Sequence, residues 1–246
     1  MYYHNLIKFM INKIIVNIIN KISKYEFKKI SLTAKYIAKS HINGGQLFLF
    51  GTGHNHCLAE EALHRAGGFA NTCPILDDRV NFSKGIKKAS ELERTKGLSK
   101  LILKKYNIKK NDTLIIFSNS GINKVPLEAE IYTKNKGLKV IAILSMKYCK
   151  STKVLEKNKI YNLVDIAIDN HGPIGDALIK VSQSVKIGTS STISGSFILN
   201  SIFIELSKLL KNEKPFPFYI SSNQKEADSH NKLLEKKFSK RNKFLK

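Results

Sequence analysis

Three short polar segments of this sequence carry side chains that can surround a small anion. After an apolar run, residues 51–56 read Gly-Thr-Gly-His-Asn-His. Residues 118–123 read Ser-Asn-Ser-Gly-Ile-Asn, and residues 188–192 read Gly-Thr-Ser-Ser-Thr. Hydroxyl groups, amides and free backbone N–H groups at a helix start are common ligands of phosphate. A single segment of this kind is explained as well by a turn and a helix cap, which Ser, Thr and Asn favour. Three together favour an anion site.

We expect the second and third segments to hold a phosphate dianion and the first segment to contact the rest of the ligand. A loop around Gly172 and Pro173, flanked by Asp169, Asn170 and Asp176, is expected to cover it. The predicted phosphate ligands are Ser118, Asn119, Ser120, Asn123, Thr189, Ser190 and Ser191. The other predicted substrate contacts are Gly51, Thr52, Gly53, His54, Asn55 and Asn170.

Nucleotide cofactors and metals receive little support from these segments. The Gly-x-Gly of residues 51–53 lacks the third glycine of a dinucleotide fingerprint, because His56 stands in its place, and no P-loop lysine motif occurs. His54, His56 and Cys57 lie close together, but no further His or carboxylate completes a recognisable ligand set. We therefore expect no cofactor and no bound metal.

The hydrophobic pattern places the polar segments at the ends of buried strands. Strand-like apolar runs alternate with helical patterns, and glycines mark the connections, which is typical of a doubly wound parallel sheet. In such sheets ligands bind at the carboxyl ends of the strands. The predicted strands are 46–50, about 74–76, 113–117, 138–144 and 164–168. The predicted helices include 7–22, 58–66, 125–135, 194–210 and 224–238, and residues 81–106 also have helical spacing.

The predicted fold class is therefore α/β, a three-layer, doubly wound, five-stranded parallel sheet with an N-terminal helical extension. No repeat or linker divides the 246 residues, so we expect one domain. Its predicted parts are N-terminal helices over 1–45, an α/β core over 46–212, and a C-terminal helix with a basic tail over 213–246.

The net charge limits the classes of partner that the protein is expected to bind. Lys and Arg number 42 and Asp and Glu 19, so the net charge is +23. Lysine, the poorer residue for bidentate phosphate or base recognition, supplies all the basic residues but four, and it is scattered along the chain except in the tail. We expect no main role in nucleic-acid binding.

Three widely spaced cysteines fit a reducing compartment, hence the cytoplasm. The apolar N-terminal stretch is amphipathic and interrupted by Lys and Asn, so neither a signal peptide nor membrane attachment is expected.

The motifs together resemble the sugar isomerase (SIS) domain, a phosphosugar-binding fold. The likeness runs from about Asn43 to Asn231 and is strongest with phosphoheptose isomerase-like SIS proteins. It rests on the polar segments 50–61 and 118–123 and on several shorter ones: 65–68, 125–126, 145–147, 168–170, 175–177 and 222–223. The resemblance implies a sugar-phosphate ligand and a homodimer or homotetramer whose site lies near the subunit interface. It also implies that residues 189–192 close over the phosphate.

The reaction is less sharply indicated. In phosphoheptose isomerases and in N-acetylmuramic acid 6-phosphate etherases, a catalytic Glu lies on the helix after the first Gly-x-Gly. The matching position here falls on or near Arg65, and the nearby carboxylates are Glu60 and Glu61. The etherases also carry a Lys where this chain has Ile193. Three interpretations stay open: an isomerase, an etherase-like lyase, and a phosphosugar-binding protein without turnover.

An aldose–ketose isomerase using enediol chemistry is the first of these. It needs a base that moves a proton between two carbons and an acid that serves the carbonyl oxygen. The predicted catalytic residues are Glu60, His56 and His230. Glu60 is favoured over Glu61 because it stands four residues after His56 on the same predicted helix face.

Overall fold

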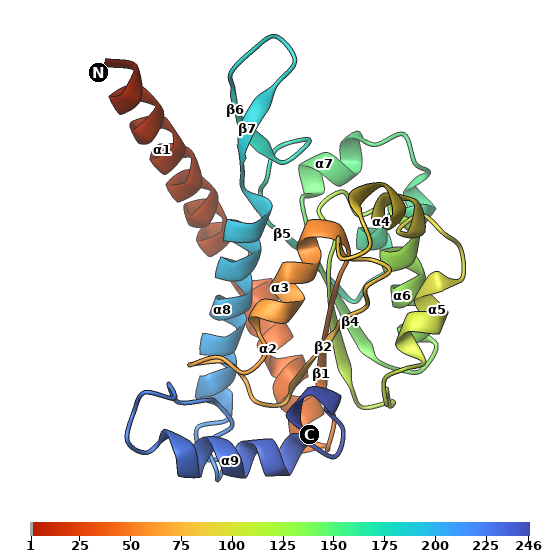
Figure 1. Ribbon diagram of the computed structural model, residues 1–246, viewed down its shortest axis with the longest axis vertical. Coiled ribbons are helices and arrows are strands. Elements are labelled where there is room, and N and C mark those ends of the chain that lie inside the picture. The colour runs from red at the N-terminus through yellow and green to blue at the C-terminus, as the bar shows by residue number, and fades with distance from the viewer. Residues whose placement is uncertain (1) are drawn as a thin grey trace.

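The computed structural model describes residues 2–246, and the surroundings of the side chains from residue 10 onward (Figure 1). Its main sheet has five parallel strands in the order β2-β1-β3-β4-β5. A separate antiparallel pair, β6 and β7, forms a hairpin. The strands are β1 Leu47–Gly51, β2 Thr72–Ile75, β3 Thr113–Phe117, β4 Lys139–Leu144, β5 Ile166–Asp169, β6 Ala177–Lys180 and β7 Lys186–Thr189.

Helices cover both faces of the sheet, so the architecture is three-layered, as the sequence predicts. Helices α2, α3 and α8 pack on one face, while α5 and α6 pack on the other (Figure 1). The α-helices are α1 Tyr2–Tyr25, α2 Phe27–Ile42, α3 His56–Glu61, α4 Ile86–Leu92, α5 Leu98–Leu103, α6 Lys124–Lys134, α7 Met146–Ser151, α8 Ser191–Leu209 and α9 Ala227–Phe238.

The alternation of side chains along each strand builds two separate cores. In β1, Leu47 and Leu49 point to the layer of α2 and α8, whereas Phe48 and Phe50 point to the layer of α5 and α6. All four side chains are buried. A parallel strand covered on both faces reads as a continuous apolar run, which is why these strands are recognisable in the sequence.

The two ends of the chain lie at opposite ends of the molecule (Figure 1). Helix α1 projects from the body, and α9 crosses the opposite end of the molecule (Figure 1). Ile18 and Ile22 in the second half of α1 are buried, while Met10 and Val16 are 44% and 49% exposed. No helix in the part of the chain that the structure describes combines the length and apolar character needed to cross a membrane.

Some element bounds differ from those predicted, and one hairpin was missed. The second strand begins at Thr72, two residues earlier than predicted, and the helix predicted over 58–66 already ends at Glu61. His64 then takes a positive φ of 49°, which a helix does not allow. The β6–β7 hairpin was not predicted: each of its strands has only four residues, and β7 is mostly exposed.

Candidate functional site

A polar cavity of about 300 Å³ opens at the carboxyl ends of β1 and β3. Strands that run in parallel end at one edge of the sheet, so the two polar segments that follow β1 and β3 face each other there. This volume is at the small end of ligand-binding cavities. The cavity is lined by Thr52, Gly53, His54, Asn55, Phe82, Ala89, Ser90, Glu93, Ser118, Asn119, Ser120, Asn123, Tyr148, Gly175 and Asp176.

The first wall is a tight turn that leads from β1 into α3. A Cβ atom on Gly51 would lie 2.2 Å from the carbonyl oxygen of Asn55, so only glycine lets the chain fold back this closely. Gly53 follows with a φ of +56°, a conformation that glycine adopts without strain. The Thr52 hydroxyl donates a hydrogen bond to the Glu93 carboxylate, which joins this turn to the end of α4.

The second wall is the turn between β3 and α6. Gly121 has a φ of +65°, and a Cβ atom there would lie 2.8 Å from the Cys149 sulfur. Among the described residues, no hydrogen bond engages the hydroxyls of Ser118 and Ser120. Asn123 is the N-cap residue of α6, yet its side chain makes no capping hydrogen bond. Helix capping, the role that would explain these polar residues without a ligand, is therefore not what their side chains do here.

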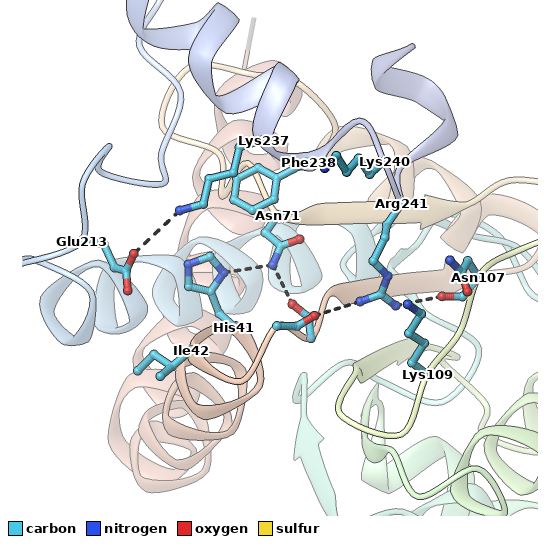
Figure 2. Close-up of a pocket in the computed structure, with 12 residues that line it drawn as sticks. His41, Ile42, Asn71, Asn107, Lys109, Glu213, Lys237, Phe238, Lys240 and Arg241 are labelled. Atoms are coloured by element: carbon cyan, nitrogen blue, oxygen red, sulfur yellow. Dashed lines mark hydrogen bonds and ion pairs between the residues drawn. The ribbon is translucent and has the colours of Figure 1, made fainter.

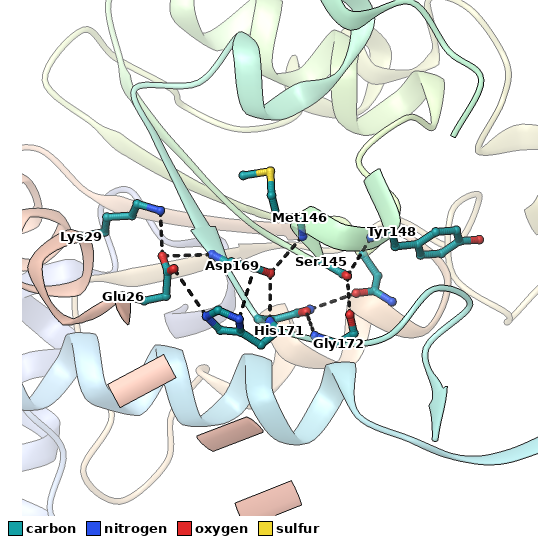
Figure 3. A network of polar contacts seen from close by, with 10 residues as sticks. Glu26, Lys29, Ser145, Met146, Tyr148, Asp169, His171 and Gly172 are labelled. Carbon is teal, nitrogen blue, oxygen red and sulfur yellow. Dashed lines mark hydrogen bonds and ion pairs between the residues drawn. The ribbon is translucent and has the colours of Figure 1, made fainter. Parts of the chain in front are cut away.

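The third wall is Gly175 and Asp176, in the loop after β5. Figure 3 shows the polar contacts that hold the start of this loop. The Asn170 amide donates to Asn119 Oδ1 at 2.9 Å, while Asn170 Oδ1 accepts from Gly172 N at 2.8 Å. The Ser145 hydroxyl donates to the Gly172 carbonyl at 2.7 Å. Asn170 is buried and is not among the cavity-lining residues, and it contacts Asn119, which is. Its role as a substrate contact stays a prediction.

The same loop is anchored to the junction of α1 and α2 through a histidine (Figure 3). His171 Nε2 lies 3.5 Å from a Glu26 oxygen, and its Nδ1 lies 3.5 Å from Asp169 Oδ2. Glu26 is buried at this junction and forms a 2.8 Å ion pair with Lys29. The loop after β5 thus contacts Asn119 on one side and the junction of the N-terminal helices on the other.

In the third polar segment, residues 188–192, two serines are hydrogen-bonded to Asp176, which lines the cavity while the serines do not. Asp176 Oδ1 accepts from the backbone N–H groups of Ser190 and Ser191 at 3.1 and 2.8 Å and from the Ser190 hydroxyl at 3.0 Å. Asp176 Oδ2 accepts from the Ser191 hydroxyl at 2.6 Å. Asp176 therefore caps α8 and presents itself to the cavity, while both serines are buried and Thr189 is exposed on β7. The phosphate-binding roles of these three residues stay predictions.

The predicted acid and base residues are not among the residues that line the cavity. His56 is buried behind the turn, with Nε2 3.4 Å from the backbone N–H of Asp77. Burial lowers the pKa of His56 despite the opposing charges of Glu60 and two aspartates. Glu60 is exposed on α3. His230 lies on α9, with Nε2 2.9 Å from the Phe218 carbonyl oxygen. Their catalytic roles also stay predictions.

Glu93 is the functional candidate that sequence reasoning missed. It is partly buried, follows α4 and lines the cavity with its carboxylate beside Thr52. In the sequence it stands among Lys, Glu and Leu residues at helical spacing, a pattern that ordinary solvated helices share. No local signal separates Glu93 from exposed Glu91; only the tertiary fold does.

No group of three His, Cys, Asp or Glu side chains arranged to hold a metal ion occurs within the part of the chain described by the structure. His54 lines the cavity and is exposed, whereas His56 is buried against Asp77. The Cys57 thiol donates to the His54 carbonyl oxygen at 2.7 Å. The three side chains therefore do not converge.

Comparisons with known proteins agree with this fold. The sequence profile described as the SIS domain matches residues 12–145. A UPF0309 protein of Brucella anthropi is 37% identical over 213 residues, which cover 86% of this chain and 88% of that relative. A phosphoheptose isomerase from Francisella tularensis superposes with a TM-score of 0.55 at 12% identity, covering 85% of this chain and 99% of that one. A Bacteroides fragilis protein, assigned as a phosphosugar isomerase involved in capsule formation, gives a TM-score of 0.57 at 16% identity, with 93% and 96% covered.

Proposed function

This chain belongs to the SIS-domain family and to the UPF0309 proteins, and from that premise we propose that its cavity binds a sugar phosphate and isomerises it. One observation carries the proposal. The hydroxyls of Ser118 and Ser120 make no hydrogen bond with the described residues, and they face one cavity together with the turn 52–55. That cavity lies on a fold shared with a phosphoheptose isomerase and with a protein assigned as a phosphosugar isomerase.

The phosphate group would lie against the start of α6. The Ser118 and Ser120 hydroxyls and the Asn123 amide donate to its oxygens, and the positive end of the helix dipole adds about 0.5–1 kcal/mol. No Lys or Arg is among the cavity-lining residues in the described part of the chain. Recognition would therefore rest on neutral donors, which select for the shape of the phosphate as well as its charge.

The sugar would extend toward Glu93, His54 and Asp176. Glu93 is the proposed base that removes the proton from the carbon next to the carbonyl group, which leaves an enediol. The protonated Glu93 then returns the proton to the neighbouring carbon. His54 is placed to move the hydroxyl proton between the two oxygens. No electrons leave the sugar, so the reaction needs no oxidant.

Binding without turnover is the second candidate function, and one observation favours it. Glu60, His56 and His230 all lie outside the cavity of the subunit. If catalysis depends on them and no other subunit supplies them, the protein binds its ligand and leaves it unchanged.

The experiment that tests the proposed function is NMR of the protein with hexose, pentose, heptose and amino-sugar phosphates in D2O. We expect deuterium to appear at the carbon next to the carbonyl group of one sugar, since the abstracted proton exchanges with solvent. Saturation transfer to a sugar without deuterium uptake would support binding alone. The absence of both signals with every sugar tested would contradict the proposal. The double variant Ser118→Ala/Ser120→Ala is the negative control, in which both signals should be lost.

We also propose that the protein assembles as a dimer or tetramer through α1 and α8. Both helices leave large apolar side chains exposed, and they pack against each other within the subunit. Val16 is 49% exposed and Ile204 60% exposed. Light scattering should give a mass two or four times that of one chain. The double variant Val16→Lys/Ile204→Lys should have the mass of a single chain. The substitution Ile86→Lys, at a residue 73% exposed on α4, is the matched control. A wild-type monomer would contradict this assembly.

A further inference from the structure

A second cavity, of about 600 Å³, lies at the amino ends of the strands (Figure 2). Its walls are the end of α2, the segments that enter β1, β2 and β3, and the end of α9 with the residues after it. Because β1, β2 and β3 are parallel, this edge of the sheet is opposite to the one with the candidate sugar-phosphate cavity. Five residues of strand separate the two edges, a length of about 17 Å.

The floor of this second cavity is made of buried, hydrogen-bonded side chains. The Asn71 amide donates to the Gly45 carbonyl oxygen at 2.7 Å and to His41 Nδ1 at 2.9 Å. Asn71 is 5% exposed and His41 9% exposed. Since Nδ1 accepts, the proton of the neutral ring is on Nε2. Burial lowers the pKa of His41, opposed by Glu213 and reinforced by Lys237, so the ring is uncharged at neutral pH. The floor therefore offers a fixed, neutral aromatic surface.

The rim of the second cavity is strongly basic. Lys109, Lys237, Lys240 and Arg241 all line it, against the single carboxylate of Glu213. Within the described residues, no carboxylate oxygen lies within 4.0 Å of the Lys109 or Lys240 ammonium group. Lys237 is 3.8 Å from Glu213. The cavity thus has two ammonium groups without ion-pair partners and a third that is loosely paired.

The guanidinium of Arg241 is held in place rather than free. Its Nη2 donates to Asp112 Oδ2 at 2.6 Å and to the Asn107 carbonyl oxygen at 2.8 Å, and its Nη1 donates to the Gly44 carbonyl oxygen at 3.2 Å (Figure 2). Its Nε is buried and has no hydrogen-bond partner among the described residues. These contacts hold the segment after α9 at the amino ends of the strands, where Lys240, next to Arg241, lines the cavity.

We propose that this cavity is a second ligand site, which binds a nucleoside diphosphate or triphosphate. The volume is sufficient for such a molecule. The base would lie on exposed Ile42 and against the small accessible part of the His41 and Phe238 side chains, each 9% exposed, that lines the cavity. The phosphates would lie between Lys109 and Lys240, with Lys237 released from Glu213. A concave site of this size does not accommodate a duplex nucleic acid, whose phosphates need an extended surface. The proposal does not depend on the reaction at the other edge of the sheet.

Calorimetric titration with ADP and, separately, with inorganic pyrophosphate tests the proposal at about 0.15 M ionic strength, where weak surface attraction is screened. Lys109→Gln/Lys240→Gln removes two charges from the cavity. Lys232→Gln/Lys236→Gln removes the same two charges from exposed positions of α9 that do not line it. This control matters because a protein with a net charge of +23 attracts any polyanion.

We expect saturable binding of one ADP per chain, weakened about 20-fold or more by Lys109→Gln/Lys240→Gln and less than about 3-fold by the control pair. The variant Ser118→Ala/Ser120→Ala should bind ADP as the wild type does, because its substitutions lie at the other edge of the sheet. Equal loss in both lysine pairs would reduce the interaction to general charge attraction and overturn the proposal. Absence of saturable ADP binding, or pyrophosphate binding as tight as that of ADP, would also overturn it.

Discussion

The double substitution Ser118→Ala/Ser120→Ala is expected to weaken sugar-phosphate binding by at least about 100-fold, with the fold unchanged. Each hydroxyl is placed to donate a hydrogen bond to a phosphate dianion, and a hydrogen bond to a charged group contributes about 1.5–3 kcal/mol. Neither hydroxyl supports the protein itself through a hydrogen bond within the described chain. Binding should therefore fall while the melting temperature stays within about 2 °C of the wild type.

Calorimetry with the sugar phosphate identified by NMR checks this result. Ser182→Ala/Ser184→Ala is the matched control, since these serines have the same spacing but lie in the exposed turn between β6 and β7. The control should bind like the wild type. If the Ser118→Ala/Ser120→Ala variant keeps its affinity, the phosphate is bound elsewhere and the assigned orientation of the ligand is wrong.

Substitution of Glu93 by Gln is expected to lower the rate of deuterium exchange by about 100- to 10,000-fold while affinity changes little. Glutamine keeps an oxygen that accepts the Thr52 hydrogen bond, so the turn after β1 stays in place. What is lost is the ability to take up a proton. The separation of a large effect on kcat from a small effect on Kd is the signature of a base, which a purely structural role would not produce.

Two further substitutions sharpen this test. Glu91→Gln changes an exposed glutamate two residues away and should leave exchange unaltered. Glu60→Gln examines the residue that the sequence predicts as the base. If Glu60→Gln abolishes exchange and Glu93→Gln does not, the base lies on α3, and the working site includes surface that is exposed in the isolated subunit.

The sheet and both polar turns of the cavity are predictable from the sequence because their signals are local. A buried parallel strand is a continuous apolar run, and the glycine after it marks a turn that no other residue can make, as at Gly51 and Gly121. Once the strands are parallel, their carboxyl ends must meet, so Thr52 and Ser118 are brought together by topology alone.

The rest of the cavity depends on long-range packing that leaves no local pattern. Glu93 is distinguished from Glu91 only by the way α4 lies over the turn after β1. The capping of α8 by Asp176 joins residues fourteen and fifteen positions apart across the β6–β7 hairpin, which the sequence does not reveal. The sequence therefore does not reveal that the hydroxyls of Ser190 and Ser191 are already bonded to Asp176.

Glu93 and Asp176 place two carboxylates in a cavity of a protein whose net charge is +23. Free phosphate and sulfate bring negative charge to this cavity and lack the several hydroxyl groups of a sugar, so they meet repulsion from carboxylates whose hydrogen bonds come only from the protein. A phosphorylated sugar brings hydroxyl groups that donate to the same carboxylates, and the repulsion is offset. On the proposed function, the abundant inorganic anions of a cell would therefore compete poorly for the cavity, although the surface of the protein attracts them.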